Sequence, residues 1–422
     1  MNRSLLLLAP TLLFAAEERT LTLREALAAA VAATPVLIAD LDAGRSDEDA
    51  AAARIRALYP NLSATGTAGK RTNAVTGANG TDATDPATTL DARLRIGQPI
   101  LNLNSYHTWR AAQAGRSVAL ANRRLAVETA CTNAAEAYVE LLRSRTQVVD
   151  RTSDLLLAEE LLKLAKARVS AGTSPALDAT RAEGQVAASR TALVSAQGAA
   201  EQATISLARV LDWDPAKTLV PADTLTDVAQ TDAPTDDSAQ AAAQESRPEK
   251  AASAAAQAAA IAARKAANGA RLPTVEAFAD GGYTGPSTGD MARTWAAGVS
   301  VTIPLFDSSP WTAESAALAE RQAQLRHLDT NRRIVAEVRG AIVGLSSATA
   351  GLAAAKEQDR VAKAELSQAK DRFTAGVASN LEVINAQLSA SQATTALTNA
   401  LANLAQARVR LAQAVGRAST LK

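Results

Sequence analysis

Residues 89–101 read Thr-Leu-Asp-Ala-Arg-Leu-Arg-Ile-Gly-Gln-Pro-Ile-Leu, and this stretch predicts a β-strand. Its apolar side chains are Leu90, Ala92, Leu94 and Ile96, and they alternate with Thr89, Asp91, Arg93 and Arg95. A period of two is typical of a strand with one apolar face and one polar, solvent-facing face. The same alternation recurs over 294–303, with apolar Trp295, Ala297, Val299, Val301 and Ile303. Two Gly-rich segments, about 61–71 and 274–284, are predicted to be the partner strands.

The two strand patterns belong to an internal repeat, which is the first feature to search for because it decides the whole fold. Thr34-Pro35 and Tyr59-Pro60 correspond to Arg247-Pro248 and Leu272-Pro273, 213 residues later. Gln98-Pro99-Ile100-Leu101 corresponds to Ile303-Pro304-Leu305-Phe306, and Arg168–Gly172 corresponds to Arg372–Gly376. Most of the change in spacing falls inside each strand pair. We therefore expect surface loops at 72–86 and 284–290, which are rich in Gly, Asn, Asp, Ser and Thr.

After each strand pair comes a long segment with helical periodicity, about 105–171 and 312–375. The first has roughly 67 residues without a proline, so as an α-helix it would extend about 100 Å. Apolar residues recur in it every seven positions, at Leu120, Val127, Ala134, Leu141, Val148, Leu155, Leu162 and Val169. The second preserves this series as Val338, Leu345, Leu352, Leu366 and Phe373, with Asp359 as the exception. A seven-residue repeat predicts a left-handed coiled coil.

Shorter helices complete each half. Returning helices are expected over about 177–211 and 381–415, after turns in which Gly172 and Gly376 adopt positive φ. Further helices are expected over about 22–58 and 248–271, before the strand pairs. The resulting division is a first repeat over 17–211, a linker or small appended segment over 212–246, and a second repeat over 247–422. Residues 1–16 have the layout of a secretory signal, with Arg3 before an apolar run.

Composition excludes several classes of function. Aromatics are only 3% of the 422 residues, which leaves few large side chains to fill several compact cores. The net charge is +1, from 44 basic and 43 acidic residues. This balance gives no positive electrostatic potential that would attract nucleic acid. His107 and His327 have no metal-ligand spacing around them, and no Gly-rich phosphate loop occurs, so we predict no enzyme, no metal and no cofactor. Cys131 is alone inside a helical segment and is expected to be a small buried apolar residue.

The aromatic residues gather near the strands. Outside the signal, eight of eleven lie in the strands or near their ends: Tyr59, Tyr106, Trp109, Phe278, Tyr283, Trp295, Phe306 and Trp311. Membrane-interface belts are one explanation, and the aromatic core of an ordinary β-sandwich is the other. No apolar run of 18 residues occurs, so a helical span is not expected. Because four strands cannot close a barrel and open edges are not tolerated in lipid, transmembrane strands require an oligomer.

The ordered motifs resemble the TolC outer-membrane efflux proteins. They are Leu21-Thr-Leu-Arg-Glu-Ala-Leu27, Thr34-Pro35, the Ala-rich run into Tyr59-Pro60-Asn-Leu62, Gln98-Pro99-Ile100-Leu101 and the two Arg-x-x-x-Gly turns. The resemblance covers essentially the mature chain. It implies a mostly helical α+β fold and a homotrimer in outer-membrane lipid, in which four strands per chain form one 12-stranded barrel continued by a periplasmic coiled-coil α-barrel. It also implies a periplasmic adaptor and an inner-membrane transporter as partners, in drug efflux or type I protein secretion.

The resemblance also implies functional positions. The hairpin turns would form the periplasmic tip where adaptors dock, here at Arg168, Gly172, Ser174, Arg372, Gly376 and Ser379. Acidic side chains that constrict the entrance in the family fall on Glu382 and Asn385, with Asp178 as the first-repeat counterpart. Asn385 is uncharged, and Ala378 stands where the family can have a basic gate residue, which puts a charge-locked gate in doubt. First-turn carboxylates also favour a helix dipole, so Asp178 and Glu382 have a purely structural explanation as well.

A different class of protein remains as an alternative, namely a periplasmic coiled-coil adaptor or scaffold with β-domains. Such adaptors normally carry one helical hairpin, whereas this chain is predicted to have two. Cargo is not determined by the sequence, because a tunnel lined by small polar groups leaves selection to its partners.

Overall fold

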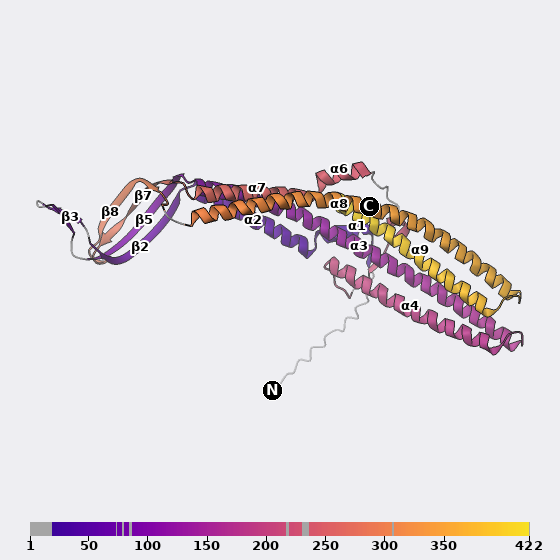
Figure 1. Ribbon diagram of the computed structural model, residues 1–422. Helices are drawn as coiled ribbons and strands as arrows, with labels where there is room; N and C mark the ends of the chain where they lie inside the picture. Colours follow the sequence, from indigo (N-terminus) through magenta and orange to yellow (C-terminus); the bar gives the residue numbers. More distant parts are fainter. Residues whose placement is uncertain are drawn as a thin grey trace, which may run out of the picture. The chain divides into compact units, whose positions relative to one another are not determined.

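The computed structural model describes residues 19–72, 74–77, 80–83, 87–216, 219–229, 236–305 and 308–421. Phe306 and the expected signal segment 1–16 lie outside these residues. The chain is mostly helical with a smaller set of strands, as expected (Figure 1). It divides into two compact units. We call 39–123 with 248–331 the sheet unit, and the remaining described residues, 19–38, 124–247 and 332–421, the hairpin unit.

The sheet unit contains one four-stranded antiparallel sheet in the order β2-β5-β7-β8. Its strands are β2 (Asn61–Arg71), β5 (Ala87–Leu101), β7 (Thr274–Gly285) and β8 (Ala292–Thr302). Since the order is open among the described residues, β2 and β8 each have one edge without a partner strand. These two edge strands are both 11 residues long.

The register gives the sheet two chemically different faces. Leu94, Gly281 and Trp295 lie in one row across β5, β7 and β8, and directly opposite residues share a face. This face carries the exposed apolar side chains Leu62, Leu94, Ile96, Tyr283, Trp295, Val299 and Val301. Arg93 and Arg95 lie on the other face. The alternation in the sequence therefore corresponds to an apolar face that this chain leaves uncovered.

Charged groups on the polar face are paired with one another. Arg93 donates to Asp91 at 2.8 Å and to Asp280 at 2.7 Å. The guanidinium of Arg95 lies 3.5 Å from Glu276 and 4.3 Å from the centroid of the Phe278 ring. Phe278 thus stands on the polar face, unlike Tyr283 and Trp295.

One expected loop contains additional structure. Within 72–86, β3 (Ala74–Gly77) and β4 (Gly80–Ala83) form a small antiparallel hairpin. Val75 and Thr76 lie opposite Asp82 and Thr81. Residues with β-branched side chains favour strands, so the absence of large apolar residues did not make this segment irregular.

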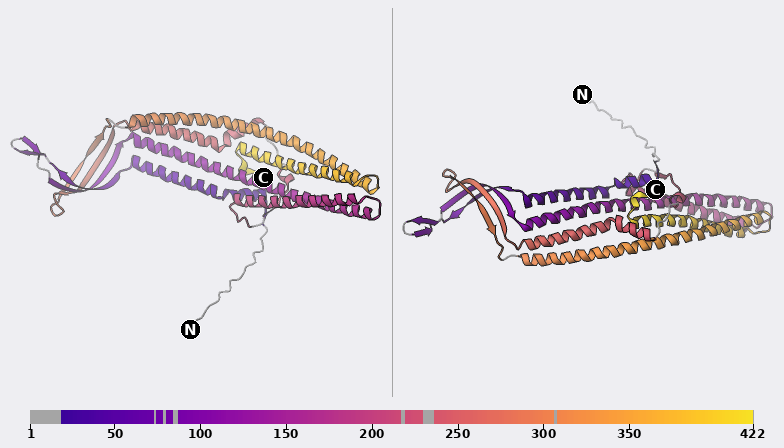
Figure 2. Two further views of the ribbon diagram at one scale, coloured as in Figure 1. Left: turned by 60° about the horizontal axis from the view of Figure 1, so that its bottom comes forward. Right: turned by 90° about the horizontal axis from the view of Figure 1, so that it is seen from above.

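Four helical segments of the sheet unit lie side by side in the same order as the strands to which they are joined (Figure 2). They come from α2 (Thr34–Leu58), α3 (Leu103–Ser170), α7 (Pro248–Gly269) and α8 (Ser309–Thr374). Two ion pairs, Arg116–Asp47 and Arg123–Asp40, join α3 to α2. Arg264 and Glu320 join α7 to α8 at 3.2 Å, and His327 bonds to Ser253 at 2.9 Å between the same helices.

The hairpin unit holds the remaining elements and most of the buried core. They are β1 (Arg19–Leu21), α1 (Leu23–Val31), α4 (Ala176–Val210), β6 (Leu219–Pro221), α5 (Leu225–Val228), α6 (Asp236–Ser246), α9 (Asn380–Val415) and the short 3₁₀ helix η1 (Ala418–Thr420). β1 and β6 pair in parallel. α1 begins with a capping box, because Thr22 accepts from the Glu25 amide at 3.3 Å and Glu25 accepts from the Thr22 amide at 2.9 Å.

Tyr138 and Cys131 lie in this core, and neither has exposed surface. The Tyr138 hydroxyl is 2.8 Å from both the Leu21 carbonyl and the Asp223 carboxylate. Burial, followed by the hydrogen bond to Asp223, raises the pKa of the Tyr138 phenol. Burial, with the charge of Glu128, raises the pKa of the Cys131 thiol to about 11. The expectation that Cys131 is a buried small residue is confirmed.

The seven-residue series of α8 faces the interior of the hairpin unit. Val338, Leu345, Leu352 and Phe373 are all buried. The exceptional member, Asp359, is buried as well at 7% exposure. Its carboxylate accepts from Thr394 at 2.8 Å and pairs with Lys363 at 2.8 Å. The stripe therefore continues through Asp359 because α9 and α8 supply partners for its charge.

Two helical stretches have the length and hydropathy of membrane spans, contrary to the expectation from uninterrupted apolar runs. They are Leu23–Leu58 and Ser309–Thr374. The first is divided into α1 and α2 between Val31 and Thr34, so it is not one continuous helix. The second is α8 itself, and only 17% of its most apolar 18-residue stretch is buried, so the buried stripe does not account for its apolar character.

Candidate functional site: the two helical hairpin turns

The hairpin turns join α3 to α4 and α8 to α9, and both have the same backbone geometry. Gly172 and Gly376 have φ of +73° and +82°, which confirms the prediction of positive φ. The Thr173 amide donates to the Arg168 carbonyl at 3.0 Å, and the Gly172 amide donates to the Val169 carbonyl at 3.0 Å. This pair of bonds is the Schellman motif, in which glycine ends a helix without steric cost. The second turn repeats it through Val377 to Arg372 and Gly376 to Phe373, each at 3.0 Å.

The returning helices begin differently. Ser379 caps α9 by accepting from the Glu382 amide at 3.4 Å. Pro175 precedes α4 and makes no side-chain cap. Ser174 instead donates its hydroxyl to the Asp178 carboxylate at 2.9 Å. Asp178 and Glu382 therefore both stand in a first helical turn, where the helix dipole favours negative charge.

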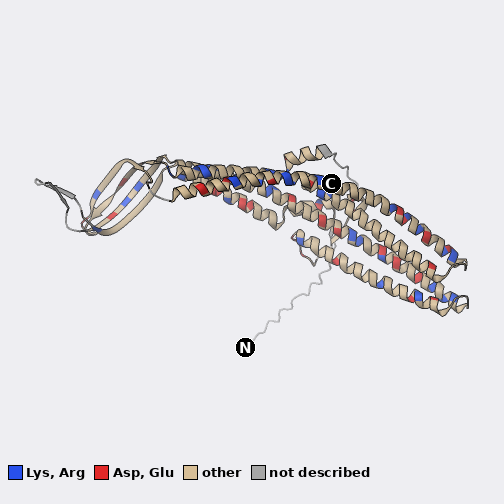
Figure 3. Cartoon of the chain, viewed as in Figure 1, with Lys and Arg blue, Asp and Glu red and all other residues tan. Residues whose placement is uncertain are grey.

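The charges at the turns are not isolated. Arg372 pairs with Glu382 at 2.9 Å across the second hairpin. Their side chains are 58% and 39% exposed, so the pair contributes little to stability. Asp178 is more covered, with 13% of its side chain exposed and Arg181 at 4.0 Å. Asn385 is exposed. Figure 3 shows that charges of both signs continue along these helices.

Contacts between the two hairpins come partly from residues that the sequence motifs indicated and partly from residues that they did not. The Arg168 guanidinium lies 4.4 Å from the centroid of the Phe373 ring. Asn380, which is fully buried, donates to the Asp178 carbonyl at 2.8 Å. Ala378 packs against the cluster formed by Leu161, Ala369, Phe373, Val383 and Ala386. Arg168 thus reaches the neighbouring hairpin, whereas Arg372 stays within its own. Asn380 follows a serine cap and has no sequence signal for its role.

A polar seam between α3 and α9 continues from the turns. Arg151 donates to Ser391 at 2.6 Å and to Thr395 at 2.9 Å, and it pairs with Asp154 at 3.1 Å. Gln387, which is 1% exposed, donates to the Asp154 carbonyl at 3.1 Å.

Asp150 belongs to the same seam and accepts from Thr398 at 2.9 Å. Burial raises the pKa of Asp150, and the hydrogen bond from Thr398 partly opposes this effect. The α3–α9 interface of the seam is therefore held by hydrogen bonds as well as by apolar contact.

Within the described ranges, no group of three or more His, Cys, Asp or Glu side chains is arranged to hold a metal ion. His327 is engaged by Ser253 and Asn331, at 2.9 Å and 3.1 Å.

This architecture is similar to that of known proteins. Residues 35–212 and 240–417 match the family described as outer membrane efflux protein. The solved structure of the outer membrane protein VceC from Vibrio cholerae has a TM-score of 0.79 and 19% identity, over 93% of this chain and 96% of VceC. The Neisseria gonorrhoeae MtrE outer membrane channel in its open state has a TM-score of 0.79 and 20% identity, over 93% and 88%.

The Campylobacter jejuni CmeC outer membrane channel has a TM-score of 0.77 and 15% identity, over 94% of this chain and 86% of CmeC. No curated protein sequence matches. At these identities the structures establish the shared fold, and the family match, which spans most of the sequence, establishes membership. The chain therefore belongs to the outer membrane efflux protein family.

Proposed function

We propose that three copies of this chain form the exit duct of a tripartite efflux pump or a type I secretion system. The duct passes substrates from a transporter and adaptor complex across the periplasm and the outer membrane. The observation that carries the proposal is the open sheet with one uncovered apolar face, in a member of the outer membrane efflux protein family. The alternative of a periplasmic adaptor is not favoured, because the family consists of outer-membrane efflux proteins.

The sheet edges support trimeric closure. A strand edge in lipid would leave its amide and carbonyl groups without partners, which costs several kcal/mol per group. β2 and β8 are the two open edges and have equal lengths of 11 residues. Pairing β8 of one copy with β2 of the next satisfies both edges. Three copies then give a closed 12-stranded barrel, with the apolar face toward lipid and the Arg93 and Arg95 face toward the lumen.

The helices would continue this barrel as an α-helical tunnel in the periplasm. We assign residues 17–211 and 247–422 to two copies of one repeat, with 212–246 as an equatorial segment at mid-height. The recurrence of long helix, glycine turn and returning helix supports this duplication. Arg168, Gly172, Ser174, Arg372, Gly376 and Ser379 would form the periplasmic tip on which the adaptor docks.

Assembly is the direct test. Outer-membrane extracts of cells that express the chain, run with and without heating in detergent, are expected to show a heat-sensitive band of three chain masses. Cross-linking before extraction is expected to give the same stoichiometry. A stable monomer in the periplasmic fraction, soluble without detergent, would contradict the proposal.

A second prediction concerns the entrance. If Asp178 and Glu382 from three copies converge on one axis, their carboxylates attract cations and repel anions. Glu382→Gln combined with Asp178→Asn is then expected to lower the cation-to-anion permeability ratio by about twofold or more. Reversal potentials in planar bilayers under a salt gradient measure this ratio.

The matched control is Glu201→Gln with Glu365→Gln, which removes the same charge from exposed positions outside the turns. An equal change in both double variants would reject the entrance assignment. The pairing of Glu382 with Arg372 makes a smaller effect at Glu382 alone expected.

A further inference from the structure

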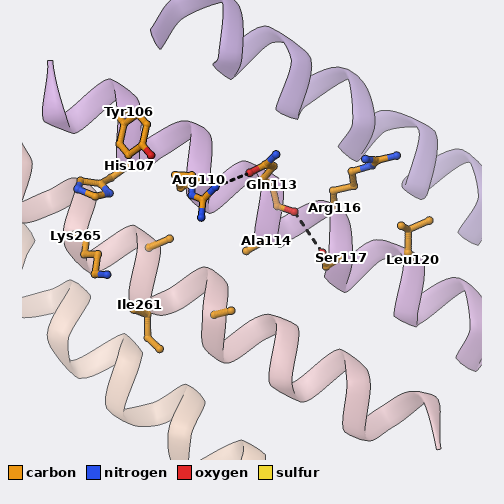
Figure 4. Close-up of a pocket in the computed structure, with 12 residues that line it drawn as sticks. Tyr106, His107, Arg110, Gln113, Ala114, Arg116, Ser117, Leu120, Ile261 and Lys265 are labelled. Atoms are coloured by element: carbon orange, nitrogen blue, oxygen red, sulfur yellow. Dashed lines mark hydrogen bonds between the residues drawn. The ribbon is translucent and has the colours of Figure 1, made fainter. Parts of the chain in front are cut away.

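A groove of about 670 Å³ lies between α3 and α7 in the sheet unit (Figure 4). From α3 it is lined by Tyr106, His107, Arg110, Gln113 and Ser117, among others. From α7 it is lined by Ala258, Ile261, Ala262 and Lys265. Its walls thus combine cations, hydrogen-bond donors and an apolar strip, which none of the functions proposed above requires.

The groove is cationic because its two helices lack nearby acids. α3 has no Asp or Glu between Leu103 and Val127, and α7 has none after Glu249. Arg110 makes a hydrogen bond to Gln113 at 3.4 Å and no carboxylate contact among the described residues. Lys265 is exposed and has no ion pair within the same residues. Arg116, at the margin of the groove, is neutralised by Asp47 from α2.

The position along the chain relates the groove to the membrane. β5 ends at Leu101 and α3 begins at Leu103, while α7 ends at Gly269 and β7 begins at Thr274. At 1.5 Å per helical residue, Arg110 and Lys265 lie roughly 6–11 Å from the sheet-proximal ends of their helices. A headgroup layer extends about 5–8 Å beyond the hydrocarbon, and long cationic side chains snorkel toward it. Side chains of α3 tilt toward its N-terminus, which is the end joined to the sheet, whereas those of α7 tilt away from the sheet. Lys265 therefore depends on its long flexible side chain to reach the headgroup layer.

Exposed apolar residues lie in the chain between the helices of the groove and the sheet. Ile100 and Leu101 at the end of β5 are 61% and 46% exposed, and Leu272 after α7 is 44% exposed. Tyr106, 39% exposed, follows one turn into α3. An aromatic residue with a polar tip at this level is typical of a membrane interface. From the sheet toward the groove, the exposed side chains change from apolar to aromatic to cationic. A molecule with acyl chains against the sheet and an anionic head against the helices matches this order.

We propose that the groove binds the phosphate headgroup of an anionic phospholipid from the periplasmic leaflet. Arg110 and Lys265 hold the phosphate, the His107 ring provides further polar contact, and Ile261 meets the glycerol and first methylenes. Charge-assisted bonds to phosphate are the strong contacts of such a site. The inference rests on the proposed orientation of the chain in the outer membrane.

Native mass spectrometry of the full-length protein with phosphatidylglycerol, phosphatidylcholine or inorganic phosphate tests the proposal. Phosphatidylglycerol is expected to remain bound in preference to phosphatidylcholine. Arg110→Gln with Lys265→Gln is expected to weaken phosphatidylglycerol binding at least about tenfold. The matched control is Arg54→Gln with Arg321→Gln: Arg54 lies four residues from the end of α2, as Lys265 does in α7, and Arg321 bonds to Gln324 as Arg110 bonds to Gln113. The control is expected to bind normally.

Equal phosphatidylglycerol binding by both double variants would overturn the groove assignment. Equal retention of phosphatidylcholine would show that negative charge is not recognised, and full competition by inorganic phosphate would show a simple anion site; either result overturns the lipid proposal. The same spectra report the oligomeric state. Absence of the trimer would refute the proposed assembly. The groove is tested separately, because phosphatidylglycerol binding by the two double variants can be compared on the trimer or on the monomer.

Discussion

Ala297→Arg is expected to abolish trimer assembly, whereas Ala296→Arg is expected to preserve it. The two alanines are neighbours in the middle of β8 and differ in the face they occupy. Ala297 lies in the row of Ile96 and Ala279 on the apolar face. An arginine on the lipid face near the bilayer centre costs about 2–4 kcal/mol, so three copies would cost roughly 6–12 kcal/mol per trimer.

Ala296 is the matched control because it lies directly opposite Asp280 on the polar face. An arginine there lies opposite a carboxylate that already accepts from Arg93, so its charge has a partner on the polar face. The measurement is the amount of heat-sensitive trimer in outer-membrane extracts, normalised to total expressed chain. Equal yields from the two variants would mean that the apolar face of the sheet does not meet lipid.

Phe373→Ala is expected to loosen the turn region of the hairpin unit more than any other single change at the turns. Phe373 is 1% exposed and packs with Leu161 of α3 and Val383 of α9. Truncation of a buried phenylalanine costs about 3–5 kcal/mol, from lost burial and from the cavity that remains. The Arg168 guanidinium also loses the ring against which it lies.

Hydrogen–deuterium exchange of the assembled protein measures this effect. Exchange in peptides that cover Leu161 to Gly172 and Leu366 to Val383 is expected to accelerate by about a hundredfold or more, since each 1.4 kcal/mol is tenfold. Val377→Ala is the control, because Val377 is in the same turn region and 69% exposed. Similar acceleration in both variants would show that Phe373 does not hold the hairpins together.

The sequence was most informative where a pattern repeats along one element. Alternation over 89–96 predicted the strand β5, because side chains of a strand point to opposite faces in turn. Seven-residue spacing predicted the long helices, and Gly172 and Gly376 were expected at positive φ, which only a residue without a Cβ adopts freely. The mostly helical fold with strands follows from these local patterns, and the family resemblance rests on their order.

The candidate site was predicted less completely. Positions of the turns were visible from the glycines, whereas the partners of their side chains were not. Arg168 and Arg372 occupy equivalent positions in the repeat, yet Arg168 lies over Phe373 and Arg372 pairs with Glu382. The burial of Asn380 has no local signal, and the seven-residue series gave the position of Asp359 without the partners of its carboxylate. Such contacts depend on how one helix is rotated against another, and helix rotation is set by packing over the whole interface.

By itself, the sequence determined the long strands and helices, where the hairpins turn and which face of the sheet is apolar, because these properties depend on residues close together in the chain. Only the tertiary structure decided which side chains meet between α3 and α9 and that Arg110 and Lys265 share one groove. Residues more than 150 positions apart come together there, and no local periodicity specifies their contact. Between α3 and α9, packing selects the polar pairs because a buried polar group without a partner costs more than its hydrogen bond contributes.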